Sequence, residues 1–338
     1  MSAALEITNL SLALGEGAAR RDILGGVGVR CERGEVVGLV GESGSGKSMT
    51  LRSVLGLLPR GAQVSGSVTV GDVDVLTCPP EELREIRRKR VSIIFQDPRA
   101  HINPARRIGD FLTEGMVRNG VAKDAARERA KELLLAVGLE RAEHHLKQFP
   151  HELSGGMLQR VMIASALACE PEVLLADEPT TALDVTTQAE IMAILRRLRD
   201  ERGLTVLLVT HDLELAAAVC DRINVMYAGT IVEQQPSAAL FENPRHPYTA
   251  GLLASSPRRV ADGERLSAIP GRPLGLHEAP AGCVFSTRCA YVTDACEQAR
   301  PPLAAIAGGR SACRREAELG ALLPTTTSTQ EVGHGSGR

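Results

Sequence analysis

A glycine-rich turn near the N-terminus has the residue types and spacing of a phosphate-binding loop. The turn consists of Gly41, Glu42, Ser43, Gly44, Ser45, Gly46, Lys47 and Ser48. An apolar run precedes it and a helical pattern follows, so the glycines can curve the backbone N–H groups toward the positive end of a helix dipole. Lys47 could reach the β- and γ-phosphates of a nucleotide, and the Ser48 hydroxyl could ligate Mg²⁺. This strand–turn–helix context favours nucleotide binding over a chance glycine-rich turn.

Two adjacent carboxylates end a second apolar run. Residues 173–176 are Val, Leu, Leu and Ala, and Asp177 and Glu178 follow them. Beside a phosphate loop, Asp177 could help to hold Mg²⁺, directly or through water, and Glu178 could polarise the water that attacks the γ-phosphate. In isolation, the same pair would be an ordinary strand exit with solvated acids.

A serine–glycine turn precedes another helical pattern. Ser154, Gly155 and Gly156 belong to a turn over residues 153–157, which stands before the helical run that begins at Leu158. The serine can simply cap the helix, but a helix N-terminus can also bind an anion. One triphosphate has little use for two separate helix-end sites, so the second would serve a nucleotide held by another subunit.

The elements that must position these groups alternate along the chain. Apolar runs predict buried strands over residues 35–40, 91–96, 173–176 and 205–209. Helical patterns lie between them, which indicates a parallel α/β core with ligands at the carboxyl ends of its strands. Shorter alternating runs predict a small antiparallel β-layer, over parts of residues 1–34 and over residues 66–71 and 73–76. Residues 123–137 have apolar residues at helical spacing and predict a helical subdomain.

Length and composition set limits on the class of protein. The 338 residues, of which 43% are hydrophobic, suffice for two domains or for one with an appendage. A net charge of −2 leaves no basic footprint, so we expect no nucleic-acid partner. The apolar runs are strand-sized and do not approach the length of a bilayer span. The first residues lack the charged and apolar regions of a signal peptide, from which we expect no export and a cytoplasmic setting.

The eight cysteines fall into two groups. Four are scattered and are read as small apolar or surface residues: Cys31, Cys78, Cys169 and Cys220. The other four crowd into the last sixty residues: Cys283, Cys289, Cys296 and Cys313. In a reducing compartment, this crowding favours metal or cluster binding over disulfides.

Taken in order, the motifs resemble those of the ATPase subunit of ATP-binding-cassette (ABC) transporters. The corresponding motifs are Walker A (residues 41–48), the Q-loop (Gln96), the signature (residues 153–157), Walker B (residues 173–178), the D-loop (Ala182, Leu183 and Asp184) and the switch histidine (His211). The resemblance implies a P-loop cassette fold, an α/β fold with a parallel core sheet, an antiparallel β subdomain and a helical subdomain.

The family resemblance also implies roles and partners for these residues. A head-to-tail dimer would hold two ATP molecules, each between the phosphate loop of one subunit and Ser154, Gly155 and Gly156 of the other, with Asp184 at the same interface. His211 would sense the γ-phosphate. Gln96 would contribute to the Mg²⁺ site with Ser48 and Asp177, and would couple the nucleotide to a membrane-embedded partner.

Other segments resemble one branch of that family, the dipeptide, oligopeptide and nickel importers. These segments are residues 95–104, 246–253 and 269–289, with Cys296 and Cys313 beyond them. The resemblance implies a [4Fe–4S] cluster held by the four crowded cysteines. Their spacing of five, six and sixteen intervening residues is looser than the C-x-x-C pairs of zinc ribbons, so zinc is the second choice and a disulfide the third. The expected domains are a cassette over residues 1–240, a cysteine-containing C-terminal extension over residues 241–320 and a disordered tail over residues 321–338.

Two positions depart from the family pattern. The signature ends in Met157 where glutamine is commoner, a form associated with the peptide-importer branch. The family usually stacks an aromatic residue on adenine from a position upstream of Walker A, yet Phe95 is the first aromatic residue in this sequence. An aliphatic contact is therefore expected to replace that stacking.

The function expected from the sequence is ATP hydrolysis that powers the import of peptides or related small solutes. The expected partners are two membrane-spanning permease subunits, a second homologous ATPase and an extracytoplasmic solute-binding protein, with this chain at the cytoplasmic face of the membrane. One alternative is a soluble ABC-type ATPase of repair or translation, but long coiled-coil insertions and a second cassette are missing. Another is a regulatory module that holds ATP without turnover, against which Glu178, Asp184 and His211 argue.

Overall fold

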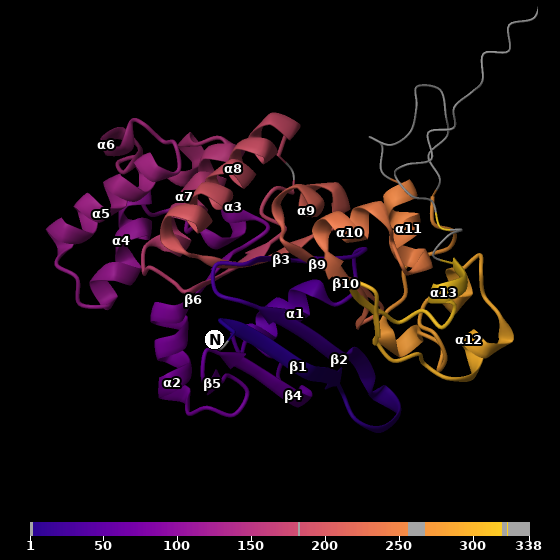
Figure 1. Ribbon diagram of the computed structural model, residues 1–338. Helices are drawn as coiled ribbons and strands as arrows, with labels where there is room; N and C mark the ends of the chain where they lie inside the picture. The colour runs from indigo at the N-terminus through magenta and orange to yellow at the C-terminus, as the bar shows by residue number, and fades with distance from the viewer. Residues whose placement is uncertain (1–2, 182, 256–267, 320–322, 324–338) are drawn as a thin grey trace, which may run out of the picture.

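The computed structural model describes residues 3–181, 183–255, 268–319 and 323. Figure 1 shows a helical subdomain at one end of the molecule, formed by α4 (Ile108–Arg118), α5 (Lys123–Ala136) and α6 (Ala142–His145). The C-terminal extension, coloured orange to yellow, lies at the opposite end. The predicted helix over residues 123–137 is thus confirmed as α5. The predicted disordered tail, residues 321–338, lies outside the described residues except for Leu323.

A mixed sheet forms the centre of the molecule. Its strands, in spatial order, are β11 (Ala304–Ile306), β12 (Gly309–Ser311), β10 (Thr230–Pro236), β9 (Arg222–Tyr227), β3 (Val36–Val40), β8 (Thr205–Thr210), β7 (Val173–Asp177) and β6 (Val91–Ile94). Pairing is parallel from β6 through β9, and antiparallel from β9 to β11. The prediction of a parallel α/β core is confirmed. The chain leaves β6 two residues earlier than predicted, because Asp97 caps the next helix by accepting a hydrogen bond from the N–H of Arg99 (2.9 Å).

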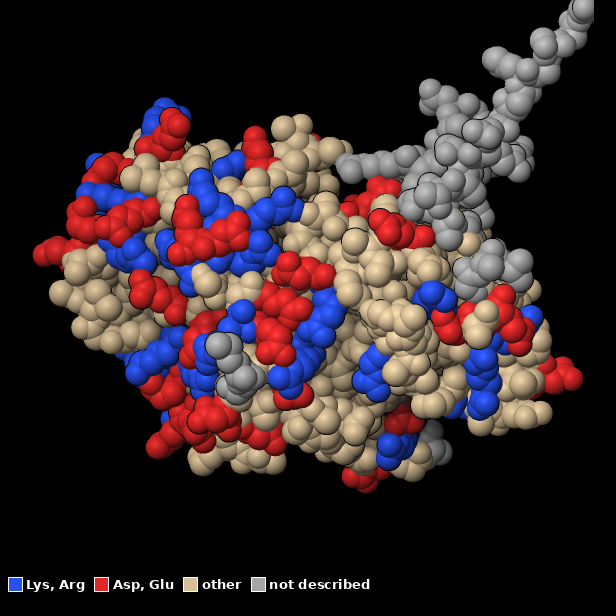
Figure 2. Space-filling model, in the orientation of Figure 1, with Lys and Arg blue, Asp and Glu red and all other residues tan. Residues whose placement is uncertain are grey.

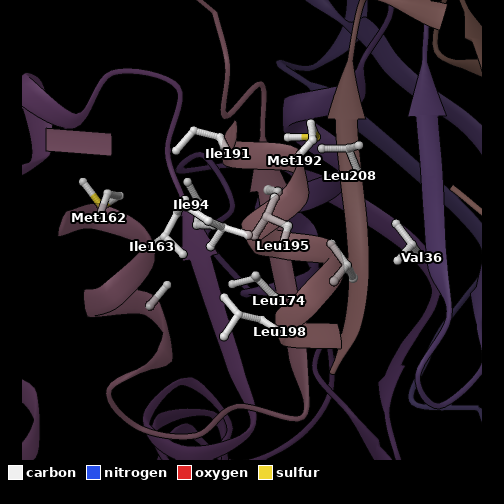
Figure 3. Packing of buried hydrophobic residues seen from close by; sticks show 14 of the residues in the cluster. Val36, Ile94, Met162, Ile163, Leu174, Ile191, Met192, Leu195, Leu198 and Leu208 are labelled. Carbon is white, nitrogen blue, oxygen red and sulfur yellow. The ribbon is translucent and has the colours of Figure 1, made fainter. Parts of the chain in front are cut away.

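Both faces of the core sheet are buried, because its strands contribute apolar side chains to each face, as in β7. Leu174 and Ala176 belong to one hydrophobic cluster, whereas Val173 and Leu175 belong to the other. Successive side chains of a strand point to opposite faces, so one apolar run supplies both clusters. Figure 3 shows the first cluster, in which Leu174 lies close to Leu195 and other side chains of α8 (Val185–Arg202).

The second cluster joins the core sheet to a smaller antiparallel sheet. The strands of this sheet, in spatial order, are β2 (Arg21–Cys31), β1 (Leu5–Leu14), β4 (Gln63–Val70) and β5 (Val73–Asp74). The predicted antiparallel layer is confirmed, but β5 stops two residues short of the predicted end. The carboxylate of Asp74 accepts hydrogen bonds from the N–H groups of Val68 (3.2 Å) and Leu76 (3.1 Å), which turns the chain away from the ladder.

The remaining elements connect these layers. In the cassette they are α1 (Lys47–Val54), α2 (Pro80–Glu85), a π-helical turn (Ile86–Arg90), α3 (Pro98–His101), α7 (Gly155–Leu167), α9 (Leu213–Val219) and α10 (Ser237–Glu242), with 3₁₀ turns at Gly17–Ala19 and Pro150–Glu152. In the extension they are α11 (Pro247–Ala254), 3₁₀ turns at Leu276–Glu278 and Ser286–Arg288, α12 (Asp294–Gln298) and α13 (Glu316–Leu319). The expected domain boundary after residue 240 falls within α10, and β12 of the extension pairs with β10 of the core sheet.

Charged side chains are mixed on the face shown in Figure 2. Lysines and arginines lie beside aspartates and glutamates over the helical subdomain, rather than in a separate basic patch. One example is Lys131, which contacts Glu128 at 2.8 Å within α5. Among the helices of the described residues, none combines the length and apolar character needed to cross a membrane.

Candidate nucleotide site

The glycine-rich turn joins β3 to α1 and encloses a buried lysine. Lys47 is 5% exposed, and its Nζ donates hydrogen bonds to the carbonyl oxygens of Gly41 (2.7 Å) and Glu42 (2.9 Å). Burial lowers the pKa of Lys47, while the nearby carboxylates of Glu178, Asp177 and Glu42 act to raise it. The site therefore concentrates one partly desolvated positive charge within a ring of backbone groups.

Glycine is required at two places in this turn. Gly46 has a φ of +107°, and a Cβ there would lie 2.7 Å from the side chain of Leu24. A Cβ on Gly41 would lie 2.1 Å from the carbonyl oxygen of Met226. The close approach of β2 and β9 thus fixes the curvature of the cradle. Ser45 Oγ is buried here without a protein hydrogen-bond partner, which suits a cradle for phosphate oxygens.

The two oxygen groups predicted to hold Mg²⁺ lie together. Ser48 Oγ, at the start of α1, donates to Asp177 Oδ1 at the end of β7 (3.0 Å). Burial raises the pKa of Asp177, and the hydrogen bond from Ser48 acts in the opposite direction. A hydroxyl and a carboxylate are ligands that suit Mg²⁺. Gln96, the third predicted ligand, contacts Glu178 instead of this pair.

Glu178 lies at the centre of a polar group at the ends of three strands. Its Oε2 accepts hydrogen bonds from Thr181 Oγ1 (2.9 Å) and Gln96 Nε2 (3.3 Å), and it lies 3.2 Å from His211 Nδ1. The contact with His211 lowers the pKa of Glu178, and the same contact raises the pKa of His211. The carboxylate therefore stays ionised near neutral pH, as a base that accepts a proton from water must be.

The backbone at Glu178 is also unusual. Its φ is +45°, in the left-handed region that non-glycine residues rarely adopt, and its N–H donates to the Val209 carbonyl oxygen (2.9 Å). That bond joins the ends of β7 and β8, so the sheet holds the strained residue in place. Such strain is often found at functional sites.

Eight of the fifteen residues predicted for the nucleotide site line one cavity of about 830 Å³, a volume that suits a nucleotide. The predicted residues among its lining are Ser43, Gly44, Gly46, Lys47, Ser48, Gln96, Glu178 and His211. Ile23, Glu42, Met49 and Pro273 also line it and were not among the predicted binding residues. Thr181 was missed as well, although its position three residues after Glu178 places it within reach of that carboxylate.

The signature and D-loop residues lie elsewhere. Ser154 caps α7 by accepting a hydrogen bond from the N–H of Met157 (3.3 Å), and Asp184 caps α8 through the N–H of Thr187 (3.0 Å). Gly155 lines a different cavity, of about 440 Å³, together with Gln96. The structure thus does not bring Ser154, Gly155, Gly156 or Asp184 into the cavity of Lys47.

The four crowded cysteines meet in the extension. They line one small cavity of about 20 Å³, and all are free thiols: Cys283, Cys289, Cys296 and Cys313. Burial raises the pKa of Cys283 and Cys289, and raises that of Cys313 to about 12. Within the described part of the chain, no set of three or more His, Cys, Asp or Glu side chains has the arrangement of a site for a single metal ion.

Comparison with known proteins adds two family matches. Residues 24–181 match the model of the ABC transporter family, and residues 232–296 match that of the oligopeptide/dipeptide transporter C-terminal region. The oligopeptide transport ATP-binding protein OppD of Salmonella typhimurium is 45% identical over 287 residues, covering 84% of this chain and 85% of that protein. OppD of Mycobacterium tuberculosis is 44% identical over 319 residues, covering 93% of this chain and 52% of that protein.

Solved structures show the same likeness for the cassette. The ATP-binding cassette MJ0796, a dimer in a post-hydrolysis state bound to ADP and Pi, is 31% identical, with a TM-score of 0.62 over 69% of this chain and 98% of that one. The protein cbiO1 of Clostridium perfringens, part of the transporter complex cbiONQ, is 28% identical, with a TM-score of 0.63 over 71% of this chain and 91% of that one.

Proposed function

Since this chain belongs to the oligopeptide/dipeptide family of ABC transporter ATP-binding proteins, we propose that it binds ATP at Lys47 and uses Glu178 to hydrolyse it, and so drives the import of peptides. The observation that carries this proposal is the shared cavity of Lys47, Glu178 and His211. Hydrolysis requires a positive charge near the phosphates and a base that can accept a proton from water, and Lys47 and Glu178 would supply these two groups in the same cavity.

The residues of the proposed site have distinct tasks. The Lys47 ammonium and the backbone N–H groups of the turn hold the β- and γ-phosphates and offset their charge. Ser48 and Asp177 would hold Mg²⁺, which supplies further charge neutralisation at the phosphate oxygens when bound. Glu178 orients a water molecule and accepts its proton. Gln96 and His211, which both contact the Glu178 carboxylate, hold it in position.

We infer that a second ATPase subunit completes the site. Ser154, Gly155 and Gly156 open α7 outside the cavity of Lys47, so one chain offers them to a nucleotide held by another subunit. The dimeric form of the similar MJ0796 cassette supports this arrangement. ATP would stabilise the closed dimer by binding it more tightly than the open one, and Asp184 would lie at the same interface.

The remaining partners follow from the family and are also proposals. The closing and opening of the ATPase dimer would act on two membrane-spanning permease subunits at the cytoplasmic face of the membrane. A solute-binding protein would deliver peptides on the other side. On the face shown in Figure 2, lysine and arginine side chains lie among aspartates and glutamates rather than in a separate basic patch.

Transport in a reconstituted system tests the proposed function. The chain is assembled with its permease subunits and its partner ATPase in proteoliposomes, and the uptake of a labelled peptide is measured with the solute-binding protein outside. We expect uptake only when ATP is available to this chain. ATP hydrolysis without uptake of any peptide would contradict import, whereas absence of both would contradict the ATPase assignment.

We further propose that the four cysteines of the extension hold a [4Fe–4S] cluster, with zinc as the alternative. The fit rests on the donor set, because four free thiols that line one cavity are what such a cluster requires.

Metal analysis decides between these possibilities. Anaerobically purified protein is expected to contain iron and acid-labile sulfide, to be brown, and to lose both elements in the Cys283→Ser variant. Cys78→Ser, which alters a cysteine outside the extension, is the matched control and should retain them. Protein with zinc and no sulfide would establish the alternative, and protein with neither metal would overturn both.

A further inference from the structure

The nucleotide cavity has an aliphatic wall from two distant parts of the chain. Ile23 comes from β2, and Pro273 comes from the C-terminal extension, 250 positions later. Neither belongs to a phosphate-binding or catalytic motif. They line the same cavity as the phosphate loop, and among the described residues no Phe, Tyr or Trp belongs to its lining. On the basis of the proposed ATP binding at Lys47, we propose that Ile23 and Pro273 hold the nucleobase, so that the extension forms part of the nucleotide site.

Pro273 is carried on a segment that we call the base strap, residues 269–278. Arg288 ties the N-terminal part of the strap to the phosphate loop. Its Nε donates to the carbonyl oxygen of Pro270 (2.7 Å), while Nη1 and Nη2 donate to the two carboxylate oxygens of Glu42 (2.7 and 3.1 Å). The Arg288 side chain is only 4% exposed, whereas that of Glu42 is 24% exposed, so the bidentate pair is partly shielded from solvent and has a fixed geometry.

The C-terminal part of the strap is packed on the strands that flank the cavity. Leu276 is buried, and a Cβ added to Gly25 of β2 would lie 2.9 Å from its side chain. The same leucine would lie 3.0 Å from a Cβ on Gly229, which follows β9. Two glycines therefore allow the strap to approach the sheet closely. With both of its ends held, the strap has little freedom to move Pro273 away from the cavity.

A second residue of the extension contacts the phosphate loop directly. The hydroxyl oxygen of Tyr248, on α11, accepts a hydrogen bond from the N–H of Glu42 (2.9 Å), and Tyr248 is fully buried. Glu42 is thus held by the extension at both its backbone and its side chain. This double contact sets the distance between the loop that would hold the phosphates and the wall that would hold the base.

The chemistry of this wall suits a planar ring. Aliphatic side chains bind an aromatic base through burial of apolar area and dispersion, and they need no hydrogen bonds to its edge. Such a contact replaces the aromatic stacking that the sequence does not offer upstream of the phosphate loop. It should act on any purine nucleotide in the same way, because it does not read the groups at the base edge.

The test separates the base from the phosphates. Binding of MgATP, MgGTP and magnesium triphosphate, which lacks a base, is measured by calorimetry on the full chain. We expect Pro273→Gly to weaken ATP and GTP binding by about three- to tenfold, the loss of one aliphatic contact, and to leave triphosphate binding unchanged. Ile23→Thr keeps a β-branched residue in the strand and should give the same pattern. Pro302→Gly, at an exposed proline of the extension outside this cavity, is the matched control.

Arg288 is a positioning residue, because it would act on the nucleobase only through the base strap. Arg288→Met should lower the affinity for ATP relative to that for triphosphate, and the loss should not add to that of Pro273→Gly, because both changes act through the strap. Equal losses for ATP and triphosphate in Pro273→Gly, or no loss for either, would overturn the proposal. Wild-type protein that binds triphosphate as tightly as ATP would also overturn it. Wild-type protein that binds neither would instead contradict the proposed function.

Discussion

The Glu178→Gln variant is expected to bind ATP with nearly unchanged affinity and to lose about 10²–10⁴ of its turnover rate. Glutamine keeps the shape of the side chain and can still accept a hydrogen bond from Thr181, but it cannot take a proton from water. The substitution also removes the negative charge that raises the pKa of His211. Turnover is measured in the assembled transporter, and binding is measured by titration of the purified chain.

A surface glutamate provides the control for this variant. Glu201, in the last turn of α8, is exposed and lies 3.9 Å from Arg197 in a solvent-facing pair. Glu201→Gln should therefore leave turnover within about twofold of wild type, since exposed pairs of this kind contribute little. Turnover in Glu178→Gln equal to that of the control would remove Glu178 from the reaction.

The Lys47→Ala variant is expected to lose about 10²–10³ in turnover and, unlike Glu178→Gln, to lose ATP affinity as well. The buried ammonium contacts the backbone of the phosphate turn, through the carbonyl oxygens of Gly41 and Glu42. Removing it leaves the triphosphate with the backbone N–H groups of the turn and with Mg²⁺. The affinities for magnesium triphosphate and for ATP should fall together, which distinguishes this variant from changes to the base strap.

Lys123→Ala is the matched substitution for this test, because Lys123 begins α5 and is exposed. It should bind ATP as wild type does. A Lys47→Ala protein that remains folded by circular dichroism and binds ATP within twofold of wild type would show that the phosphates bind elsewhere.

The strands and helices around the phosphate loop could be predicted because their signals are local. An apolar run, a glycine-rich turn and a helical pattern stand next to one another in the sequence, so β3, residues 41–48 and α1 need no long-range information. The same holds for α5, whose charged and apolar residues alternate at helical spacing. Strand ends were less predictable, since side chains such as Asp74 and Asp97 compete with the ladder for backbone N–H groups.

The sequence by itself determined the chemical groups of this protein: the cradle around Lys47, the acids Asp177 and Glu178, and the thiols of the extension. Only the tertiary structure decided which of them meet. Parallel pairing of β7 with β8 brings Glu178 to His211, and the ion pair of Arg288 and Glu42 joins residues 246 positions apart. Such contacts depend on the packing of whole layers, and no short-range spacing encodes them. For that reason the contribution of the extension to the nucleotide cavity became visible only in the folded chain.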